Sequence, residues 1–282
     1  MNIADKGLLI FLILILGFAP VRSEEGMWIP LLLEKYNIED MQEKGCRLSA
    51  EQIYSINQDC LADAVVIFGR GCTGEVISAE GLVLTNHHCG FSAIQSLSSL
   101  DNNFITNGYW AMSREEELPG QDLTVTFLRY IEDVTEKIME GIDHSMDDEQ
   151  KELIIQKNMH QLTADGSGGN GSRTIIKSFY YGNEYYLFVY DVFRDIRLVG
   201  APPNSIGNFG SDQDNWMWPR HTGDFSLFRI YADKDNMPAD YSPDNIPYKP
   251  RKHFEISLNG VHEGDFTMVL GYPGSTEQFL YS

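Results

Sequence analysis

Short apolar runs separated by glycine and polar residues mark the chain from residue 64 onward. They lie at residues 64–68, 74–77, 82–85 and 122–131. In the last run, DLTVTFLRYI, apolar and polar residues alternate through Leu123, Val125 and Phe127. A period of two places one face of a strand against a core, and runs of this length are typical of small antiparallel strands. The pattern predicts a β-barrel built from such strands.

Two other segments have the spacing of helices. Residues 27–54 combine several leucines with Tyr36, Ile38 and Met41, which predicts short helices that lead into the core. Residues 133–161 repeat apolar side chains at helical intervals among charged ones, which predicts an amphipathic helical excursion from the barrel. A glycine-rich sequence, GSGGNG, follows at residues 166–171 and predicts a flexible turn.

Strand-like segments resume after residue 175. They include residues 185–190, 225–230 and 266–270, where aromatic and β-branched side chains are frequent. No internal repeat is evident. The whole pattern predicts a mainly β protein with one helical excursion.

The first residues have the composition of a secretory signal. Lys6 precedes an apolar run at residues 8–18, and permissive residues follow before Glu24. The alternative is a membrane-spanning helix, but the apolar run is shorter than the roughly 20 residues that a bilayer requires. We therefore expect residues 1–23 to be a cleaved signal peptide, so that the protein is exported and has no membrane span afterwards.

Composition and charge narrow the class of partner. The 282 residues are 43% hydrophobic, which is ordinary for a globular core, and the formal net charge is −20. Such a charge would repel the backbone of DNA or RNA, so nucleic acid is not an expected partner. The excess of acid is otherwise a usual source of solubility.

The cysteines suggest disulfides. All four fall between residues 46 and 89, namely Cys46, Cys60, Cys72 and Cys89. In an exported chain two bridges are plausible, and spacing alone allows three pairings. A zinc site made by Cys72 and Cys89 with His87 and His88 is less favoured, because adjacent histidines usually point apart and the chain has no CxxC pair. We expect neither a metal nor a cofactor.

The sequence TNHHCG, residues 85–90, carries the first candidate for chemistry. A histidine directly before a cysteine, at the end of an apolar strand, resembles the way a chymotrypsin-type protease presents its general base, so His88 is the candidate base. The chymotrypsin-like arrangement also favours a bridge between Cys72 and Cys89, which leaves Cys46 to pair with Cys60.

Two aspartates compete to orient His88. Asp122 and Asp224 each open a strand-like segment, in QDLTVTFL and TGDFSLFR. Ser167, in DGSGG, resembles the nucleophile loop of chymotrypsin-type proteases. However, the stretch between Asp122 and Ser167 is mostly acidic helix, and pairing Ser167 with Asp224 would put the serine before the acid, against the order of that fold. Ser167 is therefore interpreted as a turn residue.

An unusual segment precedes Asp224. Residues 204–226, NSIGNFGSDQDNWMWPRHTGDFS, combine tryptophans, an asparagine, several acids and a histidine. A rim loop that covers the barrel with its aromatic side chains would explain such a composition. Because the segment leads directly to a candidate catalytic acid, we expect its polar groups to lie near the catalytic cleft.

Several motifs together resemble one protease family. EGMWIP, GCTGEVISAEGLVLTNHHCG, NWMWPRHTGDFSLFR and GYPGST are similar to segments of the exported serine dipeptidyl-peptidases of Gram-negative bacteria. The resemblance covers essentially the whole chain after the signal. It implies a chymotrypsin-like double β-barrel with an inserted helical domain, and a location in the periplasm or at the cell surface.

The resemblance also implies roles for particular residues. His88 would be the general base and Asp224 the acid that orients it. Asn215 and Trp216, in NWMW, would hold the free amino group of an oligopeptide substrate, where an amide oxygen can accept ammonium protons beside an aromatic wall. The family implies a further aspartate from its C-terminal part, and a homodimer is one expectation for the full-length protein.

Length is where the chain departs from this family. Its members are more than twice as long, and their nucleophilic serine, oxyanion amides and specificity pocket come from a C-terminal segment. The chain stops at GYPGSTEQFLYS. We therefore expect residues 24–282 to be the N-terminal part of a peptidase catalytic domain, inactive alone. The alternative is a non-catalytic remnant of the same fold that binds peptides or a partner.

Overall fold

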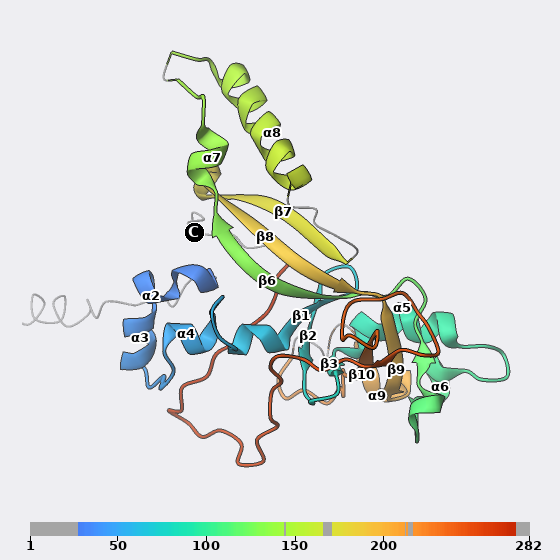
Figure 1. Ribbon diagram of the computed structural model, residues 1–282. Coiled ribbons are helices and arrows are strands. Elements are labelled where there is room, and N and C mark those ends of the chain that lie inside the picture. The colour runs from blue at the N-terminus through green and yellow to red at the C-terminus, as the bar shows by residue number, and fades with distance from the viewer. Residues whose placement is uncertain (1–27, 144, 166–170, 212, 214–216, 275–282) are drawn as a thin grey trace, which may run out of the picture. The chain divides into compact units, whose positions relative to one another are not determined.

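Strands dominate the architecture, as the sequence predicts (Figure 1). The computed structural model describes residues 28–143, 145–165, 171–211, 213 and 217–274, and residues 29–274 form one compact unit. The expected signal peptide, the turn residue Ser167 and the recognition residues Asn215 and Trp216 lie outside the described residues.

The strands of the described residues form one antiparallel sheet. Its neighbours follow the order β4-β9-β10-β3-β2-β1-β6-β8-β7, with β5 paired to β9 and β11 paired to β10. The strands are β1 (Val65–Phe68), β2 (Cys72–Val76), β3 (Leu82–Thr85), β4 (Tyr109–Trp110), β5 (Leu118–Pro119), β6 (Val125–Asp133), β7 (Ser172–Phe179), β8 (Glu184–Phe193), β9 (Asp195–Ala201), β10 (Ser226–Ala232) and β11 (Ile246–Pro247). This confirms the mainly β class, while the double barrel stays a prediction.

The register of two strands brings distant parts of the chain together. β3 pairs with β10 so that Thr85 lies opposite Ser226 and Leu84 opposite Leu227. Because the pairing is antiparallel, the end of β3 meets the start of β10. The residues just after Thr85 and just before Ser226 must therefore be neighbours, although more than half of the described chain separates them.

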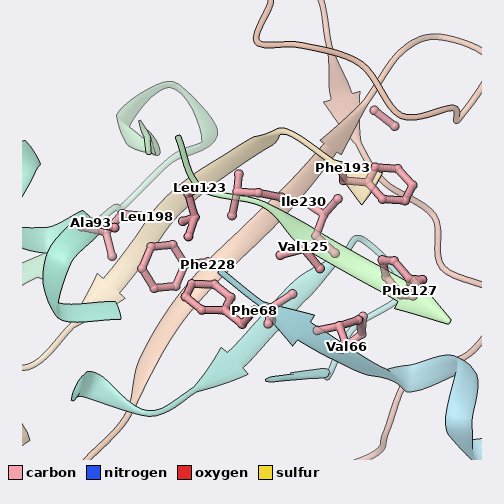
Figure 2. Packing of buried hydrophobic residues seen from close by; sticks show 14 of the residues in the cluster. Val66, Phe68, Ala93, Leu123, Val125, Phe127, Phe193, Leu198, Phe228 and Ile230 are labelled. Carbon is pink, nitrogen blue, oxygen red and sulfur yellow. The ribbon is translucent and has the colours of Figure 1, made fainter. Parts of the chain in front are cut away.

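The main core lies where β1, β6, β9 and β10 turn their apolar faces toward one another (Figure 2). The rings of Phe68 and Phe228 are in contact there, with centroids 4.8 Å apart. Ala93 and Ile94 of helix α5 (His87–Leu97) join this cluster. The buried residues His87, Gly90 and Ile94 are three or four positions apart and so share one face of the helix, and α5 packs on the core through this face.

Two helices follow β6, as predicted for residues 133–161. They are α7 (Thr135–Met139) and α8 (Asp148–Asp165). Ile138 of α7 and the α8 residues Ile155, Met159 and Leu162 belong to a separate apolar cluster with β7 and β8. In Figure 1 both helices lie beside one end of the long strands β6, β7 and β8.

The remaining helical turns are short. They are η1 (Pro30–Leu32), α2 (Leu33–Tyr36), α3 (Ile38–Glu43), α4 (Ala50–Ile53), η2 (Leu61–Ala64), α6 (Phe104–Asn107), η3 (Arg114–Glu116), η4 (Tyr180–Gly182) and α9 (Asn204–Gly207). Those before residue 54 confirm the predicted short helices. Among the described residues, no helix has both the length and the apolar character needed to cross a bilayer.

The strand predicted at residues 266–270 is wrong. Phe266, Met268 and Leu270 do alternate as a strand would, and they pack on the apolar cluster of the N-terminal helices. However, the segment is assigned to no strand. The alternation therefore reports burial of one face against helices, without the backbone ladder that defines a strand.

The predicted bridge between Cys46 and Cys60 is also wrong, because both are free, buried thiols. Cys46 belongs to the apolar cluster of the N-terminal helices. Cys60 instead precedes η2, where its Sγ lies 3.7 Å from the carbonyl oxygen of Ser55. Burial raises the pKa of the Cys60 thiol, which keeps it protonated and unreactive.

Candidate active site

The turn between β3 and α5 is held from two sides. Asn86, the residue before the helix, is extended, with ψ of 152°. Its carbonyl oxygen accepts a hydrogen bond of 2.9 Å from the hydroxyl of Ser226, at the start of β10. The hydroxyl of Thr85 donates to the carbonyl oxygen of Thr73 at 2.8 Å. These bonds fix where α5 begins relative to the sheet.

The carboxylate of Asp224 is hydrogen-bonded to the first turn of α5. One carboxylate oxygen accepts from the backbone N–H of His88 at 3.0 Å, and the other lies 2.7 Å from Nδ1 of the same residue. The side-chain amide of Asn86 also donates to the carboxylate, at 3.2 Å. The first N–H groups of a helix have no partner within it, and a negative charge there is favourable. Asp224 therefore both caps the helix and orients the side chain of His88.

This contact determines the tautomer of His88. An ionised carboxylate can only accept hydrogen bonds, so Nδ1 carries the proton and Nε2 has a free lone pair. The side chain of His88 is 60% exposed, whereas that of Asp224 is 13% exposed. A shielded acid thus holds an accessible imidazole in the form that can take up a proton at Nε2.

A disulfide ties the base-bearing helix to the sheet. Cys72 of β2 is bonded to Cys89 of α5, with a Cα–Cα distance of 6.1 Å. These two cysteines and His88 form a group of the kind that can hold a metal ion, with ligand atoms within 4.8 Å of one another. Because both sulfurs are used in the S–S bond, they offer no thiolate to a metal.

The two adjacent histidines face different environments. His87 is fully buried, in contrast to the exposed imidazole of His88. Burial lowers the pKa of His87, because desolvation disfavours the charged imidazolium. His87 is therefore neutral at pH 7.

The segment that precedes Asp224 starts and ends close to this aspartate. After α9 (Asn204–Gly207) the chain passes through residues 208–221 and returns at Gly223, whose N–H donates to the carbonyl oxygen of Ile206 at 2.9 Å. Thr222 donates to the same oxygen at 3.2 Å. The intervening segment is therefore anchored at both ends next to Asp224.

Comparison with known protein families identifies the family of this chain. Residues 23–282 match the family described as Peptidase S46. The chain belongs to peptidase family S46.

Characterised S46 relatives are much longer than this chain. An Asp/Glu-specific dipeptidyl-peptidase of Capnocytophaga gingivalis is 52% identical over 270 residues, which cover 95% of the chain and 38% of that relative. Dipeptidyl-peptidase 7 of Porphyromonas gingivalis is 45% identical, and the match covers 100% of the chain and 40% of that relative. The chain thus spans about two fifths of the length of these relatives.

Solved S46 structures have the same fold over this part. The crystal structure of Porphyromonas endodontalis DPP11 in an alternate conformation superposes with a TM-score of 0.79 at 44% identity, over 86% of this chain and 37% of that one. The same protein in complex with the dipeptide Arg-Glu gives a TM-score of 0.75. The match agrees with the antiparallel, mainly β architecture.

Of the two aspartates considered for His88 in this S46 chain, the structure brings Asp224 to it. Asp122 instead lies in the turn before β6, with a positive φ of 51°. Sequence reasoning did not identify Asn86 and Ser226 as the residues that fix the turn, nor His87 as a buried neighbour. In the sequence, Asn86 lies two residues before His88 and Ser226 lies two residues after Asp224. Only the register of β3 and β10 shows that these two positions are neighbours in space.

Proposed function

We propose that the chain supplies the general base and the orienting acid of a serine dipeptidyl-peptidase, which releases dipeptides from the free amino end of oligopeptides. The observation that carries the proposal is the contact between Asp224 and Nδ1 of an exposed His88. The names of the S46 relatives support the reaction class.

In the proposed reaction, His88 transfers a proton twice. Its Nε2 takes the proton of the serine hydroxyl while the serine oxygen bonds to the scissile carbonyl carbon. The imidazolium then gives this proton to the leaving amine as the C–N bond breaks, and water later hydrolyses the acyl-enzyme by the same route. Asp224 stays ionised and stabilises the imidazolium. We assign the nucleophilic serine to a segment outside these 282 residues, because Ser167 fits neither the order nor the spacing of the fold.

Recognition of the substrate amino group is assigned to Asn215 and Trp216. They belong to the segment 208–221, and the assignment is supported by the bond between Gly223 and Ile206, which brings the two flanks of this segment together next to Asp224. Relatives described as Asp/Glu-specific and as dipeptidyl-peptidase 7 match at 52% and 47% identity. The proposal therefore names dipeptide release and assigns no side-chain preference.

Export is part of the proposal. The apolar start of the chain and the beginning of the family match at residue 23 both support a cleaved signal peptide. The bridge between Cys72 and Cys89 fits an oxidising compartment. We place the protein in the periplasm or at the surface of a Gram-negative cell. A homodimer stays a prediction for the full-length protein.

The test measures release of dipeptides from fluorogenic dipeptidyl substrates by the complete protein. His88→Ala should abolish turnover, and acetylation of the substrate amino group should do the same. The matched control is His262→Ala, because His262 forms a surface pair with Asp265 at 3.5 Å and should leave turnover unchanged. Retention of activity in His88→Ala would remove His88 from the mechanism. Binding of free-amino peptides without any turnover would instead favour a non-catalytic peptide-binding protein.

A further inference from the structure

His87 is a buried polar side chain whose hydrogen-bonding groups are unused. Among the described residues, neither ring nitrogen has a hydrogen-bond partner, although the residue is fully buried. Leaving such a group unpaired is costly, so buried imidazoles normally have partners. An unpaired imidazole directly before the candidate base therefore requires an explanation.

The imidazole of His87 packs on helix α9. A Cβ atom built on Gly207 would overlap the His87 ring, so only glycine allows this close approach. Asn204, at the other end of α9, has an Oδ1 that is also buried and unpaired among the described residues. Burial lowers the pKa of His87, and a side-chain interaction with Asn204 opposes this shift, although the contact lacks the geometry of a full hydrogen bond. A buried group that can donate, the imidazole of His87, and a buried group that can accept, Oδ1 of Asn204, thus interact at the contact between α5 and α9 without a full hydrogen bond.

Helix α9 is connected to the candidate acid on its other side. The carbonyl oxygen of Ile206 accepts from the backbone of Gly223, and that of Gly207 accepts from the hydroxyl of Thr222 at 3.3 Å. Asp224 follows directly and binds His88. His87, α9, residues 222–224 and His88 therefore form a closed ring of contacts, in which His87 joins the base-bearing helix to the start of the segment 208–221.

We propose that His87 is a positioning residue, which holds helix α9 and the adjoining residues 222–224 against the base-bearing helix α5 through a hydrogen bond from its imidazole N–H to Oδ1 of Asn204. This inference rests on the proposed function. The bond holds α9 against α5, and the contacts of α9 with Thr222 and Gly223 then keep Asp224 in place beside His88. A fixed place for Asp224 keeps the imidazole of His88 oriented for proton transfer.

The test uses kcat and KM of the complete protein with a fluorogenic dipeptidyl substrate. His87→Phe keeps a ring but loses the N–H and should lower kcat/KM about tenfold or more, since small misplacements of reacting groups are costly. His87→Gln keeps an N–H near the position of Nε2 and should recover much of the loss. Asn204→Ala should resemble His87→Phe, and the double variant should be no worse than either single variant.

The control is Ile94→Val, a conservative change in the buried core face of the same helix, which should change kcat/KM about twofold or less because it alters mainly stability. Independent losses for His87→Phe and Asn204→Ala, or an effect of His87→Phe no larger than that of Ile94→Val, would overturn the proposal.

A second readout separates this inference from the proposed function. Hydrogen exchange of the backbone amides of Gly207 and Gly223 reports the anchoring of α9, because these amides donate to Pro203 and Ile206. In the complete protein, His87→Phe should speed their exchange about tenfold, and Ile94→Val should leave it unchanged. If no dipeptide is released from any substrate, the proposed function fails while the exchange still decides the coupling. Unchanged exchange in His87→Phe would refute it.

Discussion

Replacing Asp224 by asparagine tests the core of the site with a change of one group. The carboxylate accepts from the backbone N–H and the Nδ1 of His88 and from the amide of Asn86. An asparagine has one acceptor oxygen. If that oxygen keeps the backbone N–H of His88, the amide NH₂ faces Nδ1, which must then become an acceptor. The ring proton moves to Nε2, and the imidazole can no longer take a proton from a serine.

The change should have two separate effects, one on catalysis and one on folding. Forcing the wrong tautomer in a serine-histidine-aspartate triad costs about 10⁴-fold in kcat, or about 5.5 kcal/mol of transition-state stabilisation. Folding should suffer less, because asparagine still satisfies part of the cap. At least one of the donors loses its charged acceptor in a site where the Asp224 side chain is 13% exposed, which costs roughly 1–3 kcal/mol.

The assay compares kcat at saturating dipeptidyl substrate with the free energy of unfolding in urea, for the complete protein and Asp224→Asn. Asp265→Asn is the matched control, since Asp265 forms an exposed pair with His262 at 3.5 Å, and it should change neither quantity measurably. A folded Asp224→Asn variant that keeps more than about a tenth of wild-type kcat would refute the assignment of Asp224 as the tautomer-fixing acid.

Three further results are expected from unfolding experiments. Replacing both Cys72 and Cys89 by alanine should lower the free energy of unfolding by about 3 kcal/mol, because the bridge closes a loop of 17 residues, and an unchanged urea midpoint would contradict this. Glu117→Gln should lower the free energy of unfolding by about 3–5 kcal/mol, since it removes the carboxylate that pairs with buried Arg229 at 2.9 Å. A decrease below about 1 kcal/mol would contradict a charged pair there. The pKa of His87 is lowered in the folded state, so the unfolded state binds more protons, and stability should fall as pH drops below about 6.5. His87→Phe should flatten this dependence between about pH 7 and 5. Parallel curves would show that His87 makes no contribution, and a steeper curve for the variant would contradict the sign.

The local sequence patterns predicted which segments form strands and helices better than they predicted what those segments pack against. The glycine-bounded runs became β1, β2 and β3, and the helical spacing after residue 133 became α7 and α8. These outcomes depend on interactions within a few residues. The segment 266–270 shows the limit, because alternation of apolar residues also arises when an extended chain packs on helices. Nothing local distinguishes that case from a strand.

The site needed long-range information of two kinds. Asp122 and Asp224 look alike in sequence, and the pairing of Thr85 with Ser226 is what brings Asp224 to His88. Motif resemblance supplied this choice where spacing could not. For the cysteines, spacing left three pairings open. The chymotrypsin-like arrangement gave the bridge at Cys89 but not the fate of Cys46, which depends on a cluster built from segments at both ends of the described chain.

The long separation between the acid and the base has a consequence for how activity can be lost. His88 and Asp224 are 136 residues apart, and they meet because β10 pairs with β3. Such non-local strand pairing is slow, because the entropy of closing a long loop must be lost before the contacts form. The proposed acid–base pair therefore cannot form until β10 has paired with β3. A lesion that prevents this pairing can abolish proton transfer while both residues remain intact, and a working pair is evidence that the two strands have come together.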